Sequence, residues 1–167
     1  MSRVGNDQDA GRRVSRRVTR GFQGSRLAAA RKAFGGKPGM TIPELARLSG
    51  VSAATLRRWE SDITVPQIDK LLDVAEILEI KVPMESLIEV PRDERYPVDW
   101  RALFGLLQPT LGAMIGVRTT VVSDIERGGR LPTPKQATAI AKIYGIAPAE
   151  FLASCERARA RPPRSSY

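Results

Sequence analysis

The sequence repeats itself at a constant offset of 66 residues, and this repeat limits the fold more than any other feature does. Identical residues pair along the two copies without a gap in the alignment. The identical pairs are Pro43/Pro109, Leu45/Leu111, Gly50/Gly116, Val51/Val117, Glu60/Glu126, Pro66/Pro132, Ala75/Ala141, Ile77/Ile143 and Ile80/Ile146. Self-similarity at one fixed spacing indicates repeated copies of a structural unit. The chain of 167 residues is therefore expected to contain two copies of one small fold.

Each copy has the spacing of short helices joined by tight turns, with apolar residues at intervals of three and four. The first copy predicts helices at about 25–35, 42–49 and 53–61, a longer one that contains 68–78, and a short fifth at 84–89. The second copy predicts helices at about 98–105, 108–115 and 119–127, one that opens at 133, and a short last one around 151. The predicted fold class is therefore all-α, with two small domains of a five-helix type.

Local signals mark the ends of several of these helices. Thr41 and Glu44 have the spacing of a capping box, in which each side chain satisfies a free backbone N–H group of the first turn. Ser52 is a good N-cap for the third helix. Gly50 and Gly116 can adopt the left-handed conformation that ends a helix. The same punctuation in both copies predicts the same sharp turn between the second and third helices.

The two ends of the chain are more basic than its middle. The net charge is +9, of which residues 1–20 contribute +4 and residues 156–167 contribute +3. We therefore expect a flexible basic arm at 1–20, a domain at 21–90, a linker at 91–97, a domain at 98–154 and a basic tail at 155–167. The basic arm comprises Arg12, Arg13, Arg16, Arg17 and Arg20. Such arms can lie along phosphates, and the alternative is that they only keep the protein in solution.

Composition excludes several classes of function. No stretch is apolar enough to cross a membrane, and the N-terminus lacks the apolar core of a signal peptide, so a cytoplasmic protein is expected. Cys155 is the one cysteine and histidine is absent, which excludes disulfide frameworks and the usual zinc sites. The glycine-rich loop around Lys37 lacks the Ser or Thr and the spacing of a phosphate loop. We expect no catalysis, no cofactor, no metal and no small-molecule ligand.

The two repeated motifs resemble the helix-turn-helix of the phage-repressor and Cro (Xre) family. The resemblance rests on the runs 41–60 and 108–128 and covers roughly 25–88 and 97–153. Ala46 and Gly112 are small where two helices must cross closely, and Val51 and Val117 can fill the core under the turn. The first motif also resembles that of MerR-type regulators, but the helices before and after it fit the Xre plan better. The resemblance implies that the third helix of each domain enters the major groove of DNA.

The resemblance also implies which side chains would meet DNA. The residues expected at base edges are Ala53, Ala54, Arg57 and Arg58 in the first copy, and Thr119, Thr120, Ser123 and Asp124 in the second, with Thr55 on the same surface. The residues expected near phosphates are Ser52, Gln108, Arg118 and Arg127. Arg can read guanine through two acceptors, and Asp can accept a hydrogen bond from cytosine. For Arg57 and Arg58 the alternative is an ordinary solvated charged face.

Two further pairs match positions at which this family often joins its first helix to the end of its third. They are Arg31 with Glu60 and Arg101 with Glu126. A carboxylate can accept two hydrogen bonds from one planar guanidinium, and such a bond would tie the recognition helix to the body of the domain. The alternative is that these four side chains are exposed and unpaired.

These observations predict a sequence-specific regulator of transcription that binds double-stranded DNA, a repressor of bacterial or phage origin that acts on the nucleoid or in a phage-infected cell. One chain with two different heads would read an asymmetric site with two unlike halves. Two other readings stay open. In one, only one domain binds DNA and the other binds a partner or forms a homo-dimer, as in an antitoxin or a phage accessory factor. In the other, the protein is a nucleoid protein of low specificity.

Overall fold

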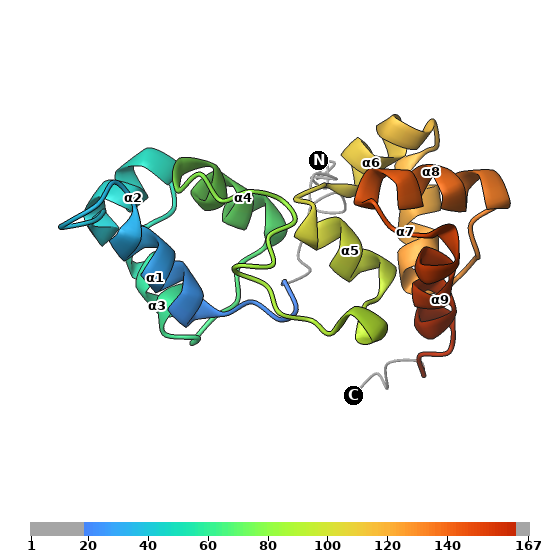
Figure 1. Cartoon of the computed structure of the whole chain (residues 1–167), viewed down its shortest axis with the longest axis horizontal. Helices are drawn as coiled ribbons and strands as arrows, with labels where there is room; N and C mark the ends of the chain where they lie inside the picture. The colour runs from blue at the N-terminus through green and yellow to red at the C-terminus, as the bar shows by residue number, and fades with distance from the viewer. Residues whose placement is uncertain (1–18, 163–167) are drawn as a thin grey trace, which may run out of the picture. The chain divides into compact units, whose positions relative to one another are not determined.

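The computed structural model describes residues 19–162, and every regular element within that range is helical. The chain divides into two compact units, with the boundary between Glu79 and Ile80. Figure 1 shows the helices of the first unit in blue and green and those of the second in yellow to red. The predicted all-α class with two helical domains is confirmed.

The first unit contains four helices: α1 (Gly24–Ala33), α2 (Ile42–Ser49), α3 (Ala53–Glu60) and α4 (Ile68–Ile77). Thr41 and Ser52 cap their helices, since Thr41 Oγ1 accepts from the Glu44 N–H at 3.3 Å and Ser52 Oγ accepts from the Thr55 N–H at 3.1 Å. Of the predicted capping box only this half forms, because the Glu44 side chain does not bond back to the Thr41 N–H in the described structure. One leucine from each helix is fully buried where the four meet: Leu27, Leu45, Leu56 and Leu71. This small apolar centre holds α2 and α3 against α1 and α4.

The short fifth helix predicted at 84–89 is wrong. Residues 85–87 form a tight turn instead, in which the Leu87 and Ile88 N–H groups both donate to the Met84 carbonyl. Met84, Leu87, Ile88 and Val90 are all buried in this stretch, so tertiary packing fixes it as a turn although its apolar spacing suits a helix. The Met84 N–H donates to the Leu103 carbonyl at 2.8 Å, so the turn is attached to the second unit.

The second unit contains a 3₁₀ turn, η1 (Arg92–Glu94), and five helices. The helices are α5 (Pro97–Leu103), α6 (Gln108–Ile115), α7 (Thr119–Arg127), α8 (Pro134–Tyr144) and α9 (Pro148–Arg159). Thr133 and Gln136 form a reciprocal capping box at the start of α8. Large apolar side chains from all five helices, Trp100, Leu111, Ile125, Tyr144 and Phe151 among them, meet in one core.

The segment predicted as a linker, 91–97, is folded onto the second unit. The Arg95 guanidinium lies 4.6 Å from the centre of the Trp100 ring and also donates to the Val90 carbonyl. Arg157 of α9 donates two hydrogen bonds to the Arg95 carbonyl, at 2.7 and 3.1 Å. Arg92 binds both carboxylate oxygens of Glu150. The segment 91–97 has the polar, proline-bounded composition of a linker, but its arginines have partners in α5 and α9.

The boundaries of the two predicted basic ends also differ from the structure. Helix α9 continues to Arg159, because Phe151, Cys155 and Ala158 lie on one face of it and are all buried. At the other end, Thr19 is buried and its N–H donates to the Pro66 carbonyl at 3.0 Å, while Arg20 is exposed. The other predicted arm residues, Arg12, Arg13, Arg16 and Arg17, lie outside the described residues.

Candidate nucleic-acid interface

A sharp turn joins α2 to α3, and an equivalent turn joins α6 to α7. Gly50 and Gly116 have φ angles of 69° and 71°, a left-handed conformation that is costly for residues with a side chain. A Cβ atom at Gly112 would lie 2.8 Å from the Val117 carbonyl oxygen, so α6 can approach its own turn only with glycine there. Buried Val51 and half-buried Val117 follow the two turning glycines. Both motifs therefore present their third helix at a fixed angle to the second.

The structure brings together both pairs of charged residues predicted to tie the third helix to the first. In the first unit, Arg31 Nε donates to Glu60 Oε1 at 2.6 Å and Nη2 donates to Oε2 at 2.9 Å. Arg31 Nη1 also donates to the Met40 carbonyl at 2.6 Å. The hydrogen bonds to Glu60 raise the pKa of Arg31 above its ordinary value. This network anchors the C-terminal end of α3 to α1.

The matching pair in the second unit is more deeply buried. The side chains of Arg101 and Glu126 are 6% and 2% exposed. Arg101 Nε and Nη2 donate to the two carboxylate oxygens of Glu126, and Nη1 donates to the Leu106 carbonyl at 2.7 Å. Gln108 Nε2 donates to Glu126 Oε2 at 2.6 Å. Three donors therefore fix one carboxylate, and through it α7.

Gln108 is thus turned inward, although the resemblance implied a phosphate contact for it. Its side chain is buried, and its amide group is occupied by Glu126. A carboxylate offers about four acceptor positions and the two-toothed bond from Arg101 occupies two of them, so Gln108 fills one of those that remain. In the first copy the equivalent residue is Ile42, and there Arg31 donates both hydrogen bonds that hold the Glu60 carboxylate.

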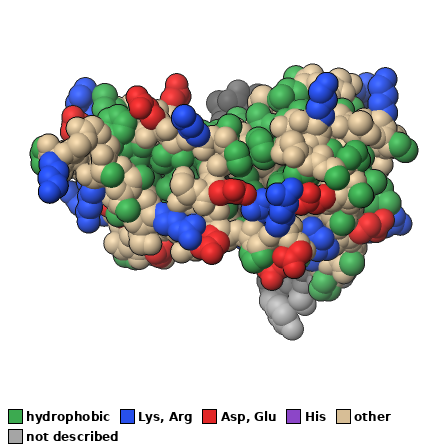
Figure 2. Space-filling model, in the orientation of Figure 1, with side chains coloured by type: hydrophobic (Ala, Val, Ile, Leu, Met, Phe, Trp, Pro, Cys, Tyr) green, Lys and Arg blue, Asp and Glu red, His purple; other side chains and the backbone are tan. Residues whose placement is uncertain are grey.

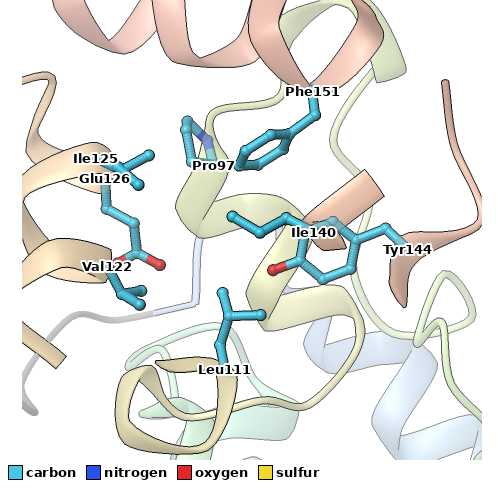
Figure 3. A pocket seen from close by; sticks show the side chains of 8 residues that line it. All are labelled: Pro97, Leu111, Val122, Ile125, Glu126, Ile140, Tyr144 and Phe151. Carbon is cyan, nitrogen blue, oxygen red and sulfur yellow. The ribbon is translucent and has the colours of Figure 1, made fainter. Parts of the chain in front are cut away.

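A small cavity lies beside this network, inside the second unit. Figure 3 shows the Glu126 carboxylate and the Tyr144 hydroxyl among the apolar side chains of Leu111, Ile140 and Phe151. The cavity measures about 10 Å³, room for at most one water molecule. Burial raises the pKa of Tyr144 well above its ordinary value, so its hydroxyl stays neutral. The cavity is too small for a nucleotide or a cofactor. The Glu126 carboxylate at its edge is part of the network that holds α7.

The outer face of α3 is open to solvent and carries two cations. Ala54, Arg57 and Arg58 are exposed, whereas Ala53 and Thr55 are half-buried. Within residues 19–162, neither Arg57 nor Arg58 forms an ion pair. Ser52 is exposed at the start of the helix, where its hydroxyl contacts the Thr55 hydroxyl at 2.8 Å. The face predicted to meet bases is therefore accessible and rich in hydrogen-bond donors.

The outer face of α7 has a different charge pattern. Thr120 is exposed and Thr119, Ser123 and Asp124 are half-buried, while Arg127 is exposed and forms an ion pair with Asp124. Arg118 precedes the helix as its N-cap residue and has no capping side-chain hydrogen bond. The cation and the anion on this face neutralise one another, in contrast to the first unit.

Asp62 is a structural residue of the motif whose role the sequence pattern did not reveal. It follows α3 with a φ of 55°, where the second copy has Gly128 with a φ of 76°. Its carboxylate accepts a hydrogen bond from the Gly24 N–H at 2.7 Å, in the first turn of α1. Asp is among the few residues that tolerate this backbone conformation. Asp62 therefore links the end of α3 to the start of α1.

Charges of both signs are interspersed on the face of the molecule drawn in Figure 2. The drawn face therefore shows no broad field of one sign. No helix in the described part of the chain is long and apolar enough to span a membrane.

Comparison with known families identifies both motifs. A helix-turn-helix family model matches residues 27–83 and again residues 99–151, well over half of the chain. No curated protein and no solved structure gives a match. The two matched regions contain the two turns, the two buried Arg–Glu pairs and the two exposed outer faces described above. The chain therefore belongs to the helix-turn-helix family of the Xre/Cro type, and it carries two domains of this DNA-binding kind.

Proposed function

We propose that this protein is a sequence-specific regulator of transcription that binds double-stranded DNA and acts as a repressor of bacterial or phage origin. The observation that carries the proposal is the outer face of α3, where Arg57 and Arg58 are exposed on a helix held by the Arg31–Glu60 pair. A guanidinium on a rigid helix can donate two hydrogen bonds to the O6 and N7 atoms of guanine. A protein bound there blocks polymerase from the same DNA, and where its site overlaps a promoter the result is repression.

In this proposal the side chains divide between bases and phosphates. The base-facing residues are Ala53, Ala54, Arg57 and Arg58 on α3, and Thr119, Thr120, Ser123 and Asp124 on α7. Thr55 lies on the same surface of α3 as the base-facing residues. Ser52, Arg118 and Arg127 lie near the helix ends and set the register on phosphates. Gln108 acts through Glu126 by holding α7. The basic residues of the N-terminal arm add phosphate contacts that carry no sequence information.

The test is selection of binding sites from a random DNA pool by the purified full chain, followed by binding measurements on the selected site. Arg57→Ala and Arg58→Ala should each cost about 1–3 kcal/mol on that site and relax the preference at one base pair. Lys70→Ala removes the same charge from α4, outside the motif, and should leave the preference unchanged. Equal losses on selected and random DNA would make both arginines phosphate contacts. A chain that enriches no sequence would instead be a nucleoid protein of low specificity.

A second candidate function is favoured by the neutral outer face of α7. In this second candidate function only the first domain reads DNA, and the second domain binds a partner protein or another copy of the chain. Stoichiometry and footprint distinguish the two candidates. One chain on an asymmetric footprint with two unlike halves supports reading by both domains. Two chains on a two-fold symmetric footprint, with α7 off the DNA, would make the second unit a dimerisation domain.

A further inference from the structure

The two recognition helices carry opposite charges at one equivalent position. The repeat offset of 66 places Asp124 of α7 where α3 has Arg58. The rest of the outer stripe also differs, since Ala54, Arg57, Arg58 and Ser61 become Thr120, Ser123, Asp124 and Arg127. The α3 stripe therefore has a formal charge of +2 and the α7 stripe has none. A reversal of sign at one place on a common scaffold changes what the helix can accept as a partner.

The Asp124 carboxylate is held in a defined orientation. Arg127 Nη2 donates to Asp124 Oδ1 from one helical turn further along α7. Within residues 19–162, no group donates to the second oxygen, Oδ2. The two side chains are 42% and 57% exposed, so the pair lies at the surface rather than in the core. One oxygen is therefore fixed, and the other is open to a donor from outside.

A carboxylate and a guanidinium make opposite demands on a base edge. In the major groove, guanine presents only acceptors at O6 and N7, and thymine presents an acceptor at O4. Cytosine N4 and adenine N6 are amino groups that donate. The carboxylate of Asp124 offers acceptors, whereas the guanidinium of Arg58 can only donate. The position that favours guanine under α3 must therefore disfavour guanine under α7.

We propose that Asp124 is a specificity-determining residue that makes the second domain require an amino group, cytosine N4 or adenine N6, at one position of its half-site. This inference rests on the proposed function and assigns a hydrogen-bond polarity to the second half-site. Arg127 is a positioning residue, because it orients the carboxylate and also cancels the repulsion between that carboxylate and the phosphates. The two half-sites then differ in kind, and one chain binds them in a single orientation.

The experiment compares the sites that the full chain and its variants select from one random DNA pool. Asp124→Ala should lose the cytosine or adenine preference at one position, with discrimination falling by about 5- to 100-fold. It should also tighten binding to random DNA, because a negative charge facing phosphates is gone. Asp124→Arg should replace that preference with guanine, as at Arg58. Glu156→Ala, which removes the same charge from an exposed position on α9 of the same unit, should change neither preference.

Arg127→Ala tests the positioning role. It should keep the same preferred base with weaker discrimination, because the carboxylate remains but its orientation is lost. Thermal unfolding of every variant verifies that the second unit stays folded, as expected for a surface pair. If the wild-type site shows two halves and Asp124→Arg leaves the second half unchanged, the inference is overturned while the proposed function stands. A wild-type chain that selects no site overturns both.

Discussion

Replacing Glu126 with glutamine should unfold most of the second unit. The carboxylate accepts two hydrogen bonds from Arg101 and one from Gln108, and the whole group is buried. Glutamine keeps the size, but its NH₂ group would face donors instead of offering an acceptor. The Arg101 charge would also remain in the core without its counter-charge. Both effects act on the residue that anchors α7.

The expected loss is about 3–5 kcal/mol, the usual cost of removing one partner from a buried ion pair. A domain of this size has only about 3–5 kcal/mol of stability to lose. The matched change in the first unit, Glu60→Gln, should cost less. The Glu60 side chain is 9% exposed rather than 2% exposed, and within residues 19–162 the hydrogen bonds to its carboxylate both come from Arg31.

Urea unfolding followed by tryptophan fluorescence measures both losses in the full chain. The two tryptophans are Trp59 in the first unit and Trp100 in the second, and both are buried. A Trp59→Phe background therefore reports on the second unit alone, and a Trp100→Phe background reports on the first. With an m-value of about 1 kcal/mol/M, the Glu126→Gln loss should lower the midpoint of the second unit by about 3–5 M, to near zero urea.

The control removes the network instead of breaking it. Arg101→Met, Glu126→Leu and Gln108→Ile together eliminate every charge and donor of the network, and isoleucine is what the first copy has at the equivalent position. This triple variant should be more stable than Glu126→Gln alone, because no buried charge is left unpaired. A Glu126→Gln midpoint within about 0.5 M of its parent would refute this account of the network.

Three further predictions concern the rest of the chain. Asp62→Ala should lose about 1–2 kcal/mol, since both the contact with α1 and the tolerance for positive φ disappear, whereas Asp62→Asn should be nearly neutral in the same urea assay. Deleting residues 2–17 removes five arginines but keeps Thr19, and should flatten the slope of log K against log salt by about 3–4; an unchanged slope would leave the arm without phosphate contacts. Burial raises the pKa of Cys155 to about 12, so a thiol reagent at pH 8 should react only after unfolding. The buried Cys155 thiol contributes fully to the free energy of unfolding below about pH 9. This contribution should fall as pH rises further, because only the unfolded thiol then ionises, and Cys155→Ala should abolish the trend.

Much of the motif follows from local rules. Gly50 and Gly116 mark the two turns because few residues accept a left-handed backbone, and Ser52 caps α3 because its hydroxyl can reach an N–H three residues on. The Arg31–Glu60 and Arg101–Glu126 pairs followed from a family resemblance that spans both copies. The base-reading roles of α3 and α7 residues remain predictions, since they depend on DNA.

Other features depended on partners far along the chain, and only the tertiary structure decided them. Residues 91–97 have the composition of a linker, but in the structure Arg157 donates to the carbonyl of Arg95, 62 residues earlier in the chain. The sequence places Gln108 at the surface, but in the structure its amide donates to Glu126. Asp62 stands where the second copy has glycine, and it is accounted for by its hydrogen bond with the start of α1, 38 residues earlier. Helical periodicity and capping involve neighbours within about four residues. The choice between water and a buried partner is made only when distant segments come together.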